Sequence, residues 1–159
     1  MRYKYTSTLL ALLLTVSVFT IPGCTTVGGT GDPVVSQQTL NDAAIILRGA
    51  ARGAAAIAIQ EKPDTRKYVQ LAVTILDQLI LDEGNYTPGA LVDALKPVLK
   101  EVNDVKIAIA INTVTDLYEV FYGRYIKARL KEKENAYMFI KSLRDGAASA
   151  LEITTNPVR

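Results

Sequence analysis

The sequence predicts an all-α domain, a small bundle of four to five helices spanning residues 35–153. Apolar residues recur every three or four positions through successive segments of helical length. Proline, glycine and asparagine fall between these segments, where helices end. The one run that alternates like a strand has no second run with which to pair. These three observations favour a helical bundle over any fold that contains a sheet.

The first helix is expected over about residues 36–61. Gly49 and Gly53 lie one turn apart in an alanine-rich stretch, and two small residues at this spacing let a neighbouring helix approach closely. Arg48 and Arg52 in the same stretch make a membrane-spanning helix costly. We therefore expect Gly49 and Gly53 to pack within the domain rather than to form a dimer interface.

Proline residues mark the limits of the next two helices. Pro63 ends the first helix, and the second is expected over 66–81, with an apolar arc wide enough for burial between other helices. Thr87-Pro88 starts the third helix, since a hydroxyl cap precedes a proline in the first turn. Pro97 should kink or split this helix, because proline lacks the amide donor and clashes with the preceding turn.

Residues 105–112 are compatible with helix or strand, because their apolar and polar side chains alternate. The run continues without a turn signal into a segment of clear helical periodicity. We therefore expect one long helix over about residues 104–131.

A last helix is expected over about residues 135–151, with Tyr137 among its inward-facing residues. Gly146 lies in its interior and should lower the stability of the helix. Residues 154–159 are expected to form a loose C-terminal tail.

The first residues of the chain have the parts of an export signal. Arg2 and Lys4 supply a positive n-region. Leu9–Ile21 is an apolar run shorter than the ~20 residues that a membrane-spanning helix needs. Gly23 supplies the small residue before a cleavage site, and Cys24, the only cysteine of the chain, follows it.

The run Ile21-Pro22-Gly23-Cys24 resembles a lipobox, the site at which signal peptidase II processes bacterial lipoproteins. Three of the four residues match the family pattern, whereas Pro22 stands where Ala, Ser, Thr or Val is usual. The resemblance covers the leader only, and we recognise no family for the mature domain. It implies that residues 1–23 are removed as a signal peptide and that Cys24 carries a diacylglyceryl group, with a further acyl chain on its amine in many bacteria.

Two other interpretations of the leader stay open. Cleavage by the ordinary signal peptidase would leave Cys24 as a free thiol, and an uncleaved leader would be an N-terminal membrane anchor. Lipidation is favoured because a single cysteine in an exported chain has no intramolecular partner. Residues 24–34, rich in glycine and small polar residues, then form a flexible tether.

The resemblance also implies a location and a first partner, which is the membrane that the lipid enters. Thr25 follows Cys24, where an Asp would resemble an inner-membrane retention signal. We therefore expect the inner leaflet of the outer membrane, facing the periplasm. In a Gram-positive cell the same signal would place the chain on the outer face of the plasma membrane.

The charge of the mature domain argues against a nucleic-acid partner. The chain has 18 Lys and Arg against 16 Asp and Glu, and the excess of two is Arg2 and Lys4 of the leader. The remaining side chains balance, whereas nucleic-acid-binding domains carry a basic excess.

Residue types that most enzymes need are missing. The chain has no histidine, and its only thiol is expected to carry lipid. No serine begins an S-x-x-K motif, and no glycine-rich nucleotide-binding motif is present. We therefore expect no enzymatic activity, no cofactor and no metal. Asp116 and Glu119, one helical turn apart, leave a cell-wall glycosidase using paired carboxylates as an alternative, although such pairs usually face solvent.

Two clusters of the fourth helix are candidate binding surfaces. The first is an aromatic stripe at helical spacing, made of Tyr118, Phe121, Tyr122 and Tyr125. It is either a ledge for a sugar or protein partner or ordinary core, and we favour core. The second is a basic cluster that begins at Arg124 and Lys127. It either rests on anionic headgroups or is the solvated end of a helix, which we favour.

These observations lead to a non-enzymatic, lipid-anchored envelope protein that binds another protein or assembles at the membrane. A carrier of a small apolar ligand or lipid, with a cavity between the helices, is the main alternative. An exclusion factor, which would block an outer-membrane receptor against phage or toxins, is a third hypothesis.

Overall fold

The structure is a computed structural model that describes residues 35–81, 85–102, 104–127 and 131–155. The chain divides into two units, residues 1–36 and 37–159, and all described helices belong to the second. The predicted signal peptide, with Gly23 and Cys24, and the predicted tether lie outside the described residues.

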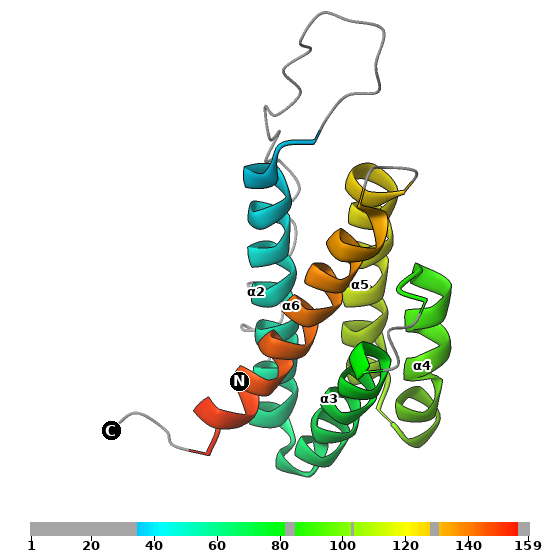
Figure 1. Cartoon of the computed structure of the whole chain (residues 1–159). Coiled ribbons are helices and arrows are strands. Elements are labelled where there is room, and N and C mark those ends of the chain that lie inside the picture. The colour runs from blue at the N-terminus through cyan, green and yellow to red at the C-terminus, as the bar shows by residue number, and fades with distance from the viewer. Residues whose placement is uncertain (1–34, 82–84, 103, 128–130, 156–159) are drawn as a thin grey trace, which may run out of the picture. The chain divides into compact units, whose positions relative to one another are not determined.

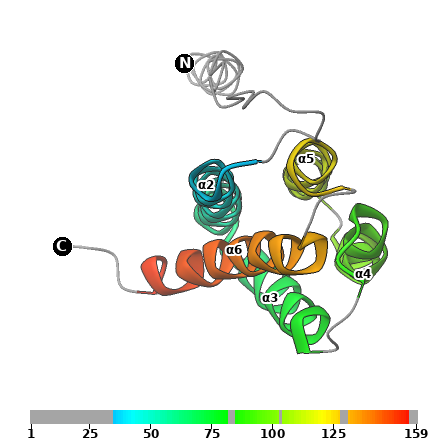
Figure 2. The ribbon, with the colours of Figure 1, turned by 45° about the horizontal axis from the view of Figure 1, so that its top comes forward.

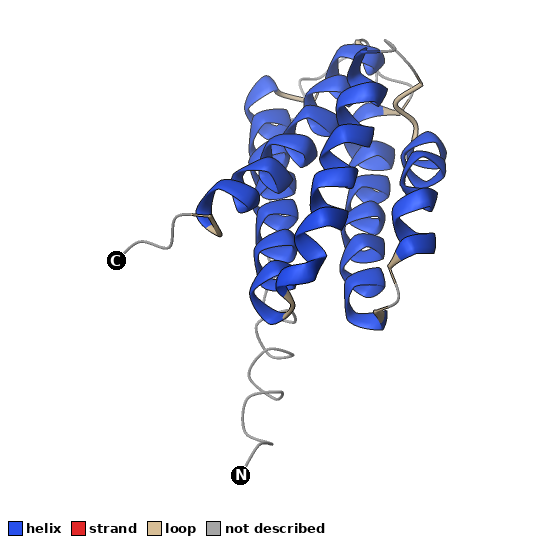
Figure 3. Cartoon of the chain, turned by 90° about the horizontal axis from the view of Figure 1, so that it is seen from below, coloured by secondary structure: helices blue, strands red, loops and turns tan. Residues whose placement is uncertain are grey.

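Among the described residues, five α-helices follow one another: α2 (Gln37–Glu61), α3 (Arg66–Leu81), α4 (Pro88–Glu101), α5 (Val105–Phe121) and α6 (Glu132–Ile153) (Figure 1). A 3₁₀ turn, η2 (Pro63–Thr65), leads into α3, and a π-helical turn, η3 (Tyr122–Ile126), extends α5. This part of the chain contains no strand (Figure 3). The all-α prediction is confirmed, and residues 105–112 are helical.

The first and last of these helices, α2 and α6, form the most extensive helix pair. Helix α6 also packs on α3 and lies between α2 and α3 (Figure 2). Helix α4 packs on α3 and α5, and α5 returns to α2. The five helices therefore close a ring of neighbours around one apolar interior.

Side-chain caps fix the starts of α4 and α5. Thr87 Oγ1 accepts a hydrogen bond from the amide of Ala90 at 3.4 Å, and Pro88 occupies the first turn, as the sequence predicts. Asp104 Oδ1 accepts a hydrogen bond from the amide of Lys106 at 2.9 Å. Each cap satisfies an amide that has no partner within its helix.

Helix α4 continues through Pro97 to Glu101, so of the two outcomes expected at this proline, a kink or a split, the split does not occur. Proline removes the hydrogen bond to the carbonyl four residues earlier, that of Asp93. Both Pro97 and Asp93 are exposed. Water can therefore replace the missing amide donor.

The helix predicted over residues 104–131 is shorter than expected. Helix α5 ends at Phe121 and passes into η3, in which Tyr122, Tyr125 and Ile126 are all buried. A π-helical turn adds a residue to each turn and shifts the side chains that follow. Tyr122, Tyr125 and Ile126 keep the i, i+3, i+4 spacing of one helix face, and all three point inward.

The close approach between α2 and α6 occurs at Gly146, not at the glycine pair that the sequence suggested. A Cβ at Gly146 would overlap the carbonyl oxygen of Arg48 and lie 3.0 Å from the Cβ of Ala51. Gly49 and Gly53 have open space where their Cβ atoms would be. The prediction that these two glycines form the packing site is therefore wrong.

Two residues of the expected loose tail hold the end of α6 in place. The guanidinium of Arg66 donates to the carbonyl of Leu151 at 3.0 Å and to the hydroxyls of Thr154 and Thr155 at 3.1 Å and 2.6 Å. These bonds satisfy carbonyl and hydroxyl groups at the C-terminal end of α6, where helical carbonyls lack partners. Thr154 and Thr155 therefore pack on the domain, and residues 156–159 of the expected tail lie outside the described residues.

Candidate ligand-binding site

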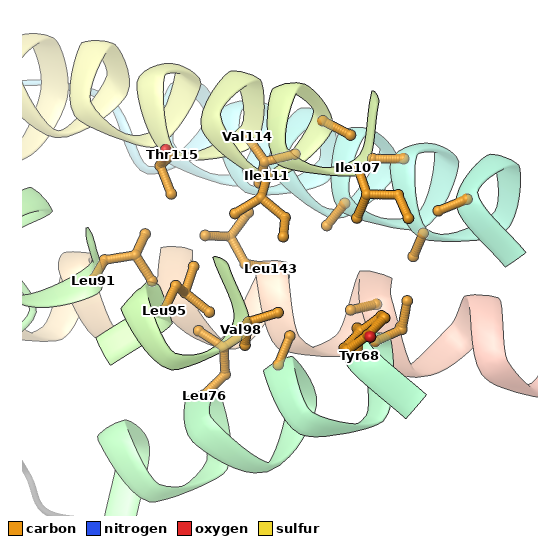
Figure 4. A pocket seen from close by; sticks show the side chains of 18 residues that line it. Tyr68, Leu76, Leu91, Leu95, Val98, Ile107, Ile111, Val114, Thr115 and Leu143 are labelled. Carbon is orange, nitrogen blue, oxygen red and sulfur yellow. The ribbon is translucent and has the colours of Figure 1, made fainter. Parts of the chain in front are cut away.

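A half-open cavity of about 100 Å³ lies between the helices (Figure 4). All five α-helices contribute to its lining. Every lining residue except Tyr68 and Thr115 is alanine, valine, leucine or isoleucine. Pockets that bind small molecules are commonly lined in this way, with a few polar groups that fix orientation.

Small side chains of α2 leave this space unfilled. Four alanines of α2 face the cavity: Ala51, Ala54, Ala55 and Ala58. Across the cavity, α3 and α5 lie on opposite sides in the close-up view (Figure 4). Because α2 presents only methyl groups, the longer side chains of α3, α4 and α5 do not close the gap.

Figure 4 places labelled lining residues at two ends of the cavity. The end with the fully buried Leu91 is called the inner end, and the end with the half-buried Tyr68 the outer end. Leu91 and Thr115 lie at the inner end, and both are buried. The hydroxyl of Thr115 donates a hydrogen bond to the carbonyl of Asn112 within α5, at 2.8 Å. The hydroxyl proton is therefore not available to a ligand. Tyr68 and Ile107 lie at the outer end, and Tyr68 is half-buried.

Charged side chains border the outer end. The Nζ atom of Lys106 lies 3.3 Å from a carboxylate oxygen of Glu61, and that of Lys62 lies 3.9 Å from Asp104. Both ion pairs join the end of α2 to the start of α5. They hold together the two helices whose alanines and isoleucines form one wall of the cavity.

The aromatic stripe of α5 and η3 belongs to the core. Tyr118, Tyr122 and Tyr125 are buried, and Phe121 is half-buried. The ring of Phe121 packs edge-on against Phe139, with 6.4 Å between the ring centres. The interpretation of these four residues as an exposed binding ledge is wrong, and the core interpretation is confirmed.

Two hydroxyls of the stripe have defined partners. Tyr118 donates a hydrogen bond to the carbonyl of Tyr86, and Tyr122 donates one to the carboxylate of Glu132. Burial raises the pKa of Tyr118 well above its ordinary value, and the Tyr122 hydroxyl adds to this shift. Burial, the hydrogen bond to Glu132 and the charge of Glu132 raise the pKa of Tyr122 to about 12. Both hydroxyls therefore stay protonated as donors at physiological pH.

The other candidate residues of α5 and η3 lie on the surface. Arg124 and Lys127 are exposed, and the Arg124 guanidinium lies 5.5 Å from the ring centre of Tyr125. Asp116 and Glu119 are both exposed as well. None of these four residues lines the cavity.

The cavity itself was foreseen only as an alternative, and no lining residue was singled out. The alanine-rich stretch of α2 is the sequence signal closest to it, but its alanines were interpreted only as part of a stretch that lets another helix approach. Tyr137, predicted to face inward, is 38% exposed and contacts Tyr86 edge-on.

Among the described residues, no helix is both long and apolar enough to cross a membrane. They also contain no group of three or more acidic, cysteine or histidine side chains that could hold a metal ion. Comparison of the whole chain with protein-family models, with curated proteins and with solved structures finds no match.

Proposed function

We propose that the chain is a lipid-anchored bacterial envelope protein whose helical domain carries a small apolar ligand or lipid. The observation that carries this proposal is the half-open cavity, with its lining of aliphatic side chains. Removing apolar surface from water stabilises a complex by roughly 25 cal/mol per Å². An apolar ligand would bury both its own surface and that of the lining.

The anchor in this proposal is the lipid on Cys24. Each buried methylene contributes ~0.8 kcal/mol, and two or more acyl chains hold a protein firmly at a membrane. The folded domain would then stand within reach of membrane lipids. A carrier at this position can take its ligand from the bilayer surface.

The domain would bind its ligand without reacting with it. The chain lacks histidine, and Tyr68 is the only ionisable residue of the cavity lining. A general acid or base needs a titratable group within hydrogen-bond reach of the reacting atom. The lining supplies shape and apolar surface instead.

A second candidate function, binding or assembly with another protein, rests on exposed aliphatic residues of α2 and α5. Ile45 is 68% exposed, Val105 75% and Ile109 58%, and Ile57 and Val120 are exposed as well. Exposed apolar patches on a small domain commonly mark interaction surfaces.

The anchor is tested by comparing the full-length chain with its Cys24→Ser variant in the native host or a bacterial host. The lipidated protein should gain the mass of the acyl groups and sediment with membranes. The serine variant should show neither property. Equal mass and equal sedimentation of both proteins would contradict the lipid anchor.

The cavity is tested with a neutral photoreactive fatty alcohol, added to membranes that contain the full-length protein. Mass spectrometry should locate adducts on peptides that line the cavity, such as residues 107–115. Ala110→Phe fills the cavity and should remove these adducts, whereas Asn112→Phe, at an exposed site of the same helix, should retain them. Adducts confined to exposed residues of α2 such as Ile45, or adducts retained in Ala110→Phe, would contradict the carrier function.

A further inference from the structure

We propose that the ligand is a medium-chain fatty acid, bound with its methyl end at Leu91 and its carboxylate beside Lys67 and Tyr68. This inference rests on the proposed function, because it names the ligand of the same cavity. Three observations carry it: the cavity is long for its volume, its inner end is apolar, and beside its outer end Lys67 makes no ion pair with a described residue.

The cavity is long relative to its volume. Its lining on α5 runs from Ile107 to Thr115, which corresponds to roughly 12 Å along the helix axis. Its volume is only about 100 Å³, below the ~150 Å³ of an engineered cavity that takes benzene. A space of this length and volume fits a single unbranched chain better than a ring, and a chain of medium length spans it with its headgroup at the outer end.

The inner end offers nothing to a polar headgroup. Leu91 is fully buried there, and Leu95 and Leu143 complete the apolar wall. The hydroxyl proton of Thr115 is already donated to Asn112. A headgroup placed here would lose its hydration without gaining a hydrogen-bond donor, which costs several kcal/mol for a charged group. The methyl end of a chain meets no such cost.

The outer end offers a donor and a cation together. The hydroxyl of Tyr68 makes no hydrogen bond with any described residue, and the ammonium of Lys67 lies 4.9 Å from the centre of the Tyr68 ring. No carboxylate of the described residues pairs with Lys67. A carboxylate at this end of the cavity can accept a hydrogen bond from Tyr68 and face the positive charge of Lys67.

The neighbouring charged side chains favour a headgroup with a negative charge. Lys62 and Lys106 are paired with Asp104 and Glu61, whereas Lys67 and its neighbour Arg66 form no ion pair with a carboxylate of the described residues. An amine headgroup would meet a like charge, and a neutral headgroup would leave Lys67 without a partner. A fatty acid is the simplest amphiphile with one chain and one anionic oxygen pair.

The test uses two photoreactive probes with the same chain, one ending in a carboxylate and the other in an alcohol. Membranes that contain the full-length protein are labelled with each probe, and adducts on cavity-lining peptides are quantified. The acid should label these peptides about two- to fivefold more than the alcohol, the range expected for one solvent-exposed charge pair. Lys67→Gln should bring the two probes to equal labelling, and Tyr68→Phe should reduce the preference.

Lys96→Gln is the matched control, because Lys96 lies on the exposed face of α4 and pairs with Asp93. It should leave the preference for the acid unchanged. Equal labelling by both probes in the unaltered protein overturns the fatty-acid inference while the proposed carrier function stands. A preference that persists in Lys67→Gln also overturns it. Absence of cavity adducts with either probe defeats the carrier function itself.

Discussion

Gly146 of α6 lies directly against the backbone of α2, where an added Cβ would overlap the carbonyl oxygen of Arg48. The overlapping atom is backbone, which cannot rotate away as a side chain can. Gly146→Ala should therefore separate α2 from α6 and lower the free energy of unfolding by about 1–3 kcal/mol. Urea unfolding followed by circular dichroism measures this change.

Gly49→Ala is the matched control for this prediction. Gly49 also lies inside a helix, but its Cβ would meet no atom within 4 Å. Alanine should here raise the free energy of unfolding by about 0.5–1 kcal/mol, because it reduces the backbone freedom of the unfolded chain. Effects of the same sign at both positions would contradict the assigned packing.

The buried hydroxyl of Tyr118 gives a second prediction. Tyr118→Phe removes the buried hydrogen bond to the carbonyl of Tyr86 while keeping the ring. One intramolecular hydrogen bond contributes about 0.5–1.5 kcal/mol, so the variant should unfold at a correspondingly lower urea concentration. Tyr137→Phe should change stability by less than about 0.5 kcal/mol, because Tyr137 is partly exposed and its hydroxyl has no recorded partner among the described residues.

The raised pKa of Tyr122 predicts how stability changes at alkaline pH. In the unfolded chain a tyrosine loses its proton near pH 10, whereas folded Tyr122 holds its proton until about pH 12. The unfolded state therefore binds fewer protons between these values, and the free energy of unfolding should fall as pH rises from 10 to 12. Below pH 10 Tyr122 should add no pH dependence.

Tyr122→Phe isolates this contribution. The variant should lose part of its stability at pH 8, because the hydrogen bond to Glu132 is gone. Its stability should then fall less steeply between pH 10 and 12, with Tyr118 supplying part of the remaining slope. An identical slope in both proteins would show that Tyr122 titrates normally in the fold.

The ion pair between Asp77 and Arg144 gives a fourth prediction, because it links α3 to α6 through two hydrogen bonds of 2.7 Å and 3.2 Å. Both side chains are partly exposed, so Asp77→Asn should cost only about 0.5–1 kcal/mol, and the difference should shrink at high salt. Asp93→Asn breaks a more exposed pair within α4 and should cost less. A larger loss for Asp93→Asn would contradict this order.

The helices were predictable from the sequence because their signals are local. Pro63, the Thr87-Pro88 start and the apolar periodicity each act within one or two turns, and all five helices lie close to their expected positions. The π-helical turn after Phe121 was not predictable, since it depends on how Tyr122 and Tyr125 fit against α6. That contact joins residues from two different helices.

The packing partners of small residues were not predictable for the same reason. Gly49, Gly53 and Gly146 are alike in sequence, yet only Gly146 meets another helix. The cavity likewise arises because the alanines of α2 face the larger side chains of α3, α4 and α5 across a gap. Periodicity identifies an apolar face, but it does not say which face lies opposite or how much space remains between them.

The pairing of α2 with α6 has a consequence for biogenesis. The two helices that share the largest interface, α2 and α6, are the first and the last described helices in the sequence. Their interface therefore cannot form until α6 has been synthesised. Contacts between distant parts of a chain form slowly and late. Under the proposed export, this delay would leave the nascent chain with few stable tertiary contacts for the translocation machinery to undo.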